Sequence, residues 1–164
     1  MNNLSDYDYN VAAYPIREGI GKAPKYYLIF CTRHPDGVKL MNSFIREEED
    51  ELLKDSTTTP NQLLLPSEEF DIAHREVHRR RKELYQLVSN YLQENHQTTR
   101  GQIRHHFIFE RFGDFHDKDY NFVVKELIQA GKLQTGHGRK SINDEEPLTF
   151  IPWEVIWALI NKIA

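Results

Sequence analysis

Three polar residues recur at helical spacing in the last third of the chain, and their chemistry suits contact with nucleic acid. Lys118, Asn121 and Lys125 are three and four residues apart, so one face of a helix would carry all of them. Ammonium groups bind backbone phosphates, and an amide reads base edges in the major groove. Three carboxylates in the same stretch would oppose that contact, namely Asp117, Asp119 and Glu126.

Four further cations occupy positions that favour phosphate contact. Arg100 and Arg104 are four residues apart at the start of a short helical pattern, and Arg139 and Lys140 lie in a polar loop between two strand patterns. Flexible cations in such loops commonly meet phosphate oxygens. These residues complete a predicted nucleic-acid-binding surface, with DNA as the favoured ligand.

Other residues of reactive type do not form a convincing site. His74 and His78 are four residues apart on a helical pattern, but a zinc site needs a further ligand that the spacing does not supply. Cys31, the single cysteine, lies in an apolar strand pattern that disfavours a nucleophilic thiolate, so we predict a buried structural thiol. The acidic run 47–51 and the basic run 79–82 are interpreted as solvated helix surface. We predict no catalytic residue, no metal and no cofactor.

Charge is distributed unevenly along the 164 residues, whose net charge is −4. Residues 72–140 carry thirteen basic and eight acidic side chains, whereas residues 36–71 carry three and ten. A positive field could therefore lie on one face of an acidic protein. No apolar run approaches the ~20 residues that cross a bilayer, and the polar N-terminus lacks the features of a secretory signal. We expect a cytoplasmic protein that makes no membrane contact.

The elements that precede the basic region are expected to be a β-hairpin and a helix. Residues 11–17 and 25–32 are predicted to be strands, because a loop containing glycine and proline separates them and the second run is rich in β-branched and aromatic residues. This second strand is apolar on both faces. Because an isolated two-stranded hairpin is marginal in water, we expect Tyr26, Leu28 and Phe30 to dock on a sheet-containing protein partner.

A helix is then expected from Asp36, ahead of a linker. Its apolar stripe comprises Val38, Met41, Phe44, Ile45 and Leu52. Residues 55–67 contain two prolines and are predicted to link this N-terminal part, residues 1–54, to the next domain.

Residues 68–151 contain three amphipathic helical patterns followed by two short strands. The first pattern ends near residue 94, the second follows Thr98 and Thr99, and the third begins at Asp114 or Asp117 and ends at Gly131. Strands are expected at 132–135 and 148–151. This order predicts an α+β fold, a winged helix-turn-helix domain preceded by a β-hairpin plus helix, in which the third helix of the domain is the recognition helix.

A last amphipathic helix is predicted at residues 152–164. Trp153 and Trp157 recur on its apolar side and would be exposed on an isolated helix. We expect these two side chains to dock on the domain or on a partner.

Two stretches resemble the three-Cys-motif partner (TcmP) family. YYLIFCTRHPDGVKLMNSFIREE, residues 26–48, is similar to the end of its methyltransferase-like domain, and residues 76–150, with the turn LIQAGKL, resemble its GMT-like winged helix-turn-helix domain. The glycine-rich turn from strand to helix that would hold a methyl donor has no counterpart, because Gly19 and Gly21 lie between two strands of a hairpin. The resemblance therefore implies no methyltransferase activity.

Two functional interpretations stay open. The chain is expected to be a non-catalytic winged-helix protein that binds DNA modestly and attaches to a partner through its N-terminal hairpin. The alternative is a protein-interaction module, the C-terminal piece of a split or truncated TcmP or methyltransferase-like protein.

Overall fold

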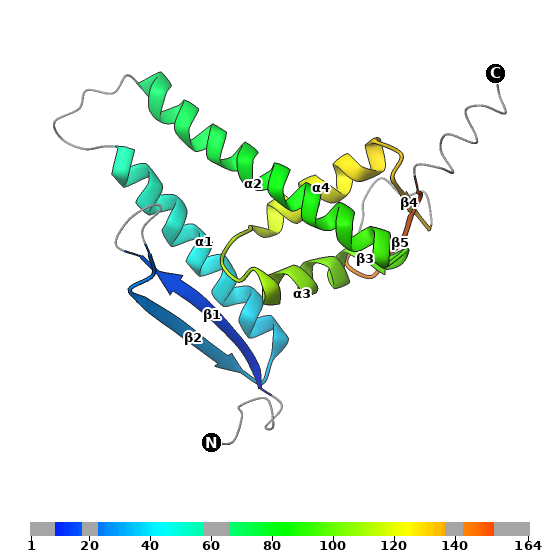
Figure 1. The fold of residues 1–164 in the computed structure, drawn as a ribbon, viewed down its shortest axis with the longest axis horizontal. Helices are drawn as coiled ribbons and strands as arrows, with labels where there is room; N and C mark the ends of the chain where they lie inside the picture. The colour runs from blue at the N-terminus through cyan, green and yellow to red at the C-terminus, as the bar shows by residue number, and fades with distance from the viewer. Residues whose placement is uncertain (1–8, 18–22, 58–65, 137–142, 153–164) are drawn as a thin grey trace. The chain divides into compact units, whose positions relative to one another are not determined.

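The computed structural model describes residues 9–17, 23–57, 66–136 and 143–152. Its fold is α+β, with a β-hairpin followed by helices and a small sheet (Figure 1), as the sequence predicts. The chain forms two compact units. The first unit comprises residues 1–73 and 106–116, and the second comprises residues 74–105 and 117–164. No helix in the described ranges combines the length and the apolar character that crossing a membrane requires.

The first unit begins with an antiparallel hairpin of β1 (Asn10–Ile16) and β2 (Tyr26–Thr32), which confirms the predicted hairpin. Residues that pair across the two strands share a face of the sheet. One face therefore carries Ala12 beside Phe30 and Tyr14 beside Leu28, whereas the other carries Val11 beside Cys31.

Helix α1 (Pro35–Thr57) follows the hairpin and lies alongside it (Figure 1). Val38 and Ile45 are buried, as expected, but Phe44 is 54% exposed and Leu52 is 64% exposed. The predicted stripe is therefore wrong at these two residues. The polar residues Asn42 and Arg46 are buried instead, because they hydrogen-bond to the loop after α3. Polar groups can be buried in this way when each finds a partner.

The prediction of a buried Cys31 is wrong, because the structure exposes this side chain. Cys31 pairs with Val11 on the face of the hairpin opposite to the buried Ala12. No described element covers that outer face. An apolar strand pattern indicates which residue types share a face, but it does not supply the element that would bury them.

The second unit contains most of α2 (Pro66–Glu94), followed by β3 (Gln97–Thr99) and the first part of α3 (Arg100–Glu110). It continues with α4 (Asp117–Gln129), β4 (Leu133–Thr135) and β5 (Pro147–Phe150). The three strands form one antiparallel sheet in the order β3-β5-β4. Sequence reasoning missed β3, because its Thr98 and Thr99 were interpreted only as the start of a helix.

Local sequence explains where α3 begins and α4 ends. The Thr99 hydroxyl accepts a hydrogen bond from Gln102 N at 3.1 Å, and Gln102 Oε1 accepts one from Thr99 N at 2.9 Å, which is a reciprocal capping box. At the end of α4, Gly131 has φ +71° and donates to Ile128 O, while Lys132 N donates to Leu127 O. These bonds form a Schellman motif, in which glycine tolerates the left-handed conformation.

The second unit has an apolar core shared by its helices and its sheet. Its fully buried large side chains are Leu84, Leu92, Ile103, Tyr120, Leu127 and Leu148. Burial of an aliphatic or aromatic side chain stabilises a fold by about 1.5–3 kcal/mol. This core fixes which face of α4 is turned inward.

The predicted linker at 55–67 lies mostly outside the described residues. Residues 55–57 form the end of α1, residues 66–67 begin α2, and 58–65 are not described. The compact units also follow boundaries other than the predicted domain at 68–151, because residues 106–116 group with the N-terminal hairpin and α1.

Candidate nucleic-acid interface

Helix α4 separates an apolar face from a polar one. The buried face carries Tyr120, Val123, Val124 and Leu127. Lys118, Phe122, Lys125 and Gln129 are exposed and follow one another at spacings of four, three and four, so they share the opposite face. The predicted residues Lys118 and Lys125 are thus accessible, and Asn121 is half-buried beside them.

Phe122 is an exposed aromatic residue between the two lysines, and sequence reasoning did not single it out. Its side chain is 40% exposed, and the guanidinium of Arg81 lies 4.2 Å from its ring centroid. Counting helical positions outward from Lys118 and Lys125 would have found it.

Asp119 does not contribute negative charge to this exposed face. Its side chain is fully buried, and its Oδ1 accepts a hydrogen bond from Arg81 Nε at 3.0 Å. The expectation that all three carboxylates of this helix oppose a polyanion is therefore corrected for Asp119. Asp117 and Glu126 remain exposed.

Arg100 and Arg104 are engaged in ion pairs within the second unit. Arg100 Nε lies 2.8 Å from Asp144 Oδ1, and Arg104 Nη2 contacts Asp144 Oδ2. One further nitrogen of each guanidinium reaches α4, because Arg100 Nη1 donates to Asn121 Oδ1 at 2.7 Å and Arg104 Nη1 donates to Asp117 Oδ2 at 3.2 Å. Two of the predicted phosphate ligands thus already hold carboxylates.

Asp144 is also held through its backbone. Its carbonyl oxygen accepts a hydrogen bond from Gly101 N at 3.0 Å, and a Cβ at position 101 would lie only 2.8 Å from that oxygen. Glycine therefore permits the close approach of this segment to α3. Asp144 gave no local signal in the sequence, since it lies within a short acidic run in a predicted loop.

The two units carry opposite net charge. The second unit has thirteen basic and ten acidic residues, whereas the first has eight and fifteen. The polar face of α4 therefore belongs to the more basic part of the chain. Separating the charges in this way would help the second unit to attract a polyanion at long range.

The three predicted docking residues of the hairpin share one face. Tyr26, Leu28 and Phe30 lie on the face of buried Ala12, where Tyr26 is 62% exposed, Leu28 is 37% exposed and Phe30 is half-buried. The outer face exposes the alternate residues, with Tyr27 and Ile29 each 62% exposed. Of the ten exposed large apolar residues in the described ranges, nine belong to the first unit.

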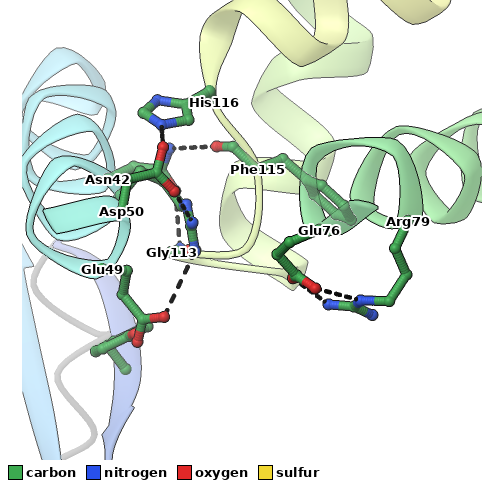
Figure 2. A network of polar contacts seen from close by, with 10 residues as sticks. Asn42, Glu49, Asp50, Glu76, Arg79, Gly113, Phe115 and His116 are labelled. Carbon is green, nitrogen blue, oxygen red and sulfur yellow. Dashed lines mark hydrogen bonds and ion pairs between the residues drawn. The ribbon is translucent and has the colours of Figure 1, made fainter. Parts of the chain in front are cut away.

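The loop after α3 is fastened to α1 within the first unit (Figure 2). Asn42 Nδ2 donates to Phe115 O at 2.9 Å, and Asn42 Oδ1 accepts from Gly113 N at 2.8 Å. Arg46 donates to Gly113 O, and His116 Nε2 lies 2.9 Å from Asp50 Oδ2. Sequence periodicity did not indicate this network, since its members lie 66 to 73 residues apart.

The basic run 79–82 is only partly the solvated surface expected of it. Arg79 is exposed and pairs with Glu76 at 2.7 Å on α2 (Figure 2), and Lys82 is exposed, but Arg80 is buried. The interpretation of Arg80 as solvated is therefore wrong.

His74 and His78 are exposed on α2, and the described residues contain no group of three side chains suited to a metal ion. The predicted residues Arg139, Lys140, Trp153 and Trp157 lie outside the described residues.

Comparisons with protein-family models, with curated proteins and with solved structures find no match for this chain. The resemblance to the TcmP family therefore stays a prediction.

Proposed function

We propose that the second unit is a winged helix-turn-helix module that binds duplex DNA through the exposed face of α4, without catalysis. The order of α2, β3, α3, α4, β4 and β5 supports this proposal. The sheet order β3-β5-β4 supports it too, since it places a hairpin directly after α4. In such modules the recognition helix enters the major groove.

The observation that carries the proposal is the composition of the exposed α4 face. Lys118 and Lys125 are accessible cations on either side of Phe122, which is 40% exposed. The lysines would contact phosphates, and the phenyl ring would make apolar contact with a base edge such as a thymine methyl group. Asn121 contributes less than predicted, because its Oδ1 already accepts a hydrogen bond from Arg100.

Fluorescence anisotropy with a random duplex at ~50 mM salt tests the proposal. The full chain should bind, and Lys118→Ala and Lys125→Ala should each weaken binding uniformly across sequences. Each variant should also reduce the slope of log affinity against log salt by about 0.9, the value for one lost phosphate contact.

Lys82→Ala provides a matched control, because Lys82 is an exposed lysine on α2 of the same unit. Its salt slope should equal that of the unaltered protein. If the full chain does not bind, or if all three lysine variants behave alike, the proposed α4 interface is wrong.

A second candidate function, attachment to a protein partner, is favoured by the outer face of the hairpin. Tyr27, Ile29 and Cys31 are exposed there opposite Pro15, Ala13 and Val11, and none of these six paired residues is charged. Contiguous apolar surface of this kind marks interaction sites on soluble domains. The TcmP resemblance would make the partner a sheet-containing, methyltransferase-like protein.

Co-expression of the full chain with the products of its neighbouring genes tests this second function. Ile29→Ser should abolish a complex that forms with the unaltered chain. Leu52→Ser is the control, because Leu52 is a 64% exposed leucine on α1 and lies outside the hairpin. Complex formation should also slow thiol labelling of the exposed Cys31. If the complex still forms with Ile29→Ser, the partner binds another surface and the proposed docking face is wrong.

A further inference from the structure

Two arginines converge on one carboxylate in the second unit. Arg100 Nε approaches one oxygen of Asp144 at 2.8 Å, and Arg104 Nη2 contacts the other oxygen. Each oxygen of the carboxylate thus receives its own charged hydrogen bond. Guanidinium N–H groups donate charged hydrogen bonds to carboxylate and to phosphate oxygens alike, so the same two arginines could hold either anion.

Solvent reaches each side chain of this triad in part. The side chains of Arg100, Arg104 and Asp144 are 22%, 16% and 36% exposed. Ion pairs that water reaches contribute little to stability, because solvent screens them. A competing anion can therefore exchange with the Asp144 carboxylate without unfolding a core.

The triad is also continuous with the polar face of α4. Arg100 donates to Asn121, and Arg104 donates to Asp117, the first residue of the helix. Asn121 lies between Lys118 and Lys125 in the helical sequence. A nucleic-acid backbone that follows these lysines would therefore pass close to both arginines.

We propose that Asp144 is the internal occupant of a phosphate site, and that a DNA backbone phosphate replaces its carboxylate when the second unit binds a duplex. This inference rests on the DNA-binding function proposed above, and it adds the regulation of the same site. Asp144 then acts as an intramolecular competitor that lowers affinity, so that Arg100 and Arg104 bind phosphate only when a duplex also engages α4.

The variant Asp144→Asn tests the proposal by removing the competing charge. Its affinity for a random duplex should rise at least about tenfold at ~0.1 M salt, which corresponds to one or more additional phosphate contacts. The slope of log affinity against log salt should steepen by about 1–2 for the same reason.

Glu145→Gln is the matched control, because it makes the same change of charge at the adjacent, exposed residue. If only the change in net charge matters, the two variants should raise the affinity for duplex DNA equally. If Asp144 competes with phosphate, only Asp144→Asn should raise this affinity. Adding Arg100→Gln and Arg104→Gln to Asp144→Asn should cancel the gain.

A measurement on the unaltered chain covers the case in which Asp144→Asn fails to fold. The Nε–H signal of Arg100 in ¹⁵N NMR spectra should shift when duplex DNA is added, because the acceptor of this group changes from the Asp144 carboxylate to a phosphate. An Arg100 signal that stays unchanged at saturation would overturn the proposal.

The outcomes separate this inference from the function on which it rests. If the unaltered chain binds DNA and Asp144→Asn raises the affinity no more than Glu145→Gln does, the proposed role of Asp144 as a competitor is wrong. The DNA-binding function then stands. If only Asp144→Asn binds, the competitor is supported and DNA binding by the unaltered chain is wrong. If neither binds, both proposals are wrong.

Discussion

The backbone N–H of Gly113 donates a hydrogen bond to Asn42 Oδ1 at 2.8 Å and so joins the loop after α3 to helix α1 (Figure 2). The Nδ2 group of the same Asn42 side chain donates a hydrogen bond to Phe115 O. One buried side chain therefore satisfies a backbone donor and a backbone acceptor of this loop. Such a group is costly to remove, because its partners stay buried without a replacement.

Asn42→Ala is accordingly expected to lower the free energy of unfolding by about 2–4 kcal/mol, since two buried backbone groups lose their partner. Urea unfolding followed by circular dichroism measures this loss. Ser43→Ala is the control, because its hydroxyl contacts only Lys39 O of its own helix in the described hydrogen bonds. That variant should change stability by less than about 0.5 kcal/mol. Equal effects of the two variants would show that the Asn42 contacts contribute nothing.

Gly113→Ala should destabilise the protein for two separable reasons. Gly113 has φ +84°, and an added Cβ would lie 2.5 Å from the ring of Tyr14. The left-handed conformation costs an L-residue about 1–2 kcal/mol, and overpacking adds about 1–3 kcal/mol. Gly131→Ala isolates the first cost, because Gly131 has φ +71° with no atom within 4 Å of the added Cβ. Thermal melting should therefore show a larger loss for Gly113→Ala.

Tyr14 should make stability depend on alkaline pH. Burial raises the pKa of Tyr14 well above its ordinary value, and its hydrogen bond to Glu49 raises that pKa further. Below pH ~10 the hydroxyl is protonated in the folded and the unfolded chain, so its stabilising contribution is complete. Above that pH the unfolded chain releases the proton first, and the contribution falls as pH rises.

The variant Tyr14→Phe cannot ionise, so its stability should fall less steeply than that of the unaltered chain between pH 9 and pH 11. At pH 7 it should lose about 1 kcal/mol with the hydrogen bond to Glu49. Melting temperatures measured across this range test both statements. Tyr27→Phe, at a position 62% exposed, is the control and should run parallel to the unaltered chain. A parallel curve for Tyr14→Phe would contradict the prediction.

Asp119→Ala is expected to cost about 2–3 kcal/mol, because it removes the buried carboxylate that Arg81 Nε contacts at 3.0 Å. Asp119→Asn keeps an acceptor oxygen and should cost less. Glu76→Ala removes a carboxylate from a more exposed pair with Arg79 and should cost less than about 1 kcal/mol. Chemical denaturation of the three variants gives this order, and a different order would show that burial of Asp119 does not govern the pair.

Local features of the fold follow from sequence patterns alone. The hairpin of β1 and β2, the amphipathic α4 and the end of that helix at Gly131 all depend on residues within a few positions of one another. Periodicity and turn chemistry act over that range, which is why they predict these elements. The same helical count places Lys118 and Lys125 opposite Tyr120 and Leu127.

Only the tertiary structure decides which charges are available. Arg100 and Arg104 look like free cations in the sequence, but Asp144, some forty residues later, pairs with both. Asn42 and Arg46 are polar residues, yet they are buried and hydrogen-bond to Phe115 O and Gly113 O. A long-range contact depends on how distant segments meet. The sequence therefore determined the residue types on each face, and tertiary packing determined which of them are exposed, because burial and ion pairing depend on neighbours in space.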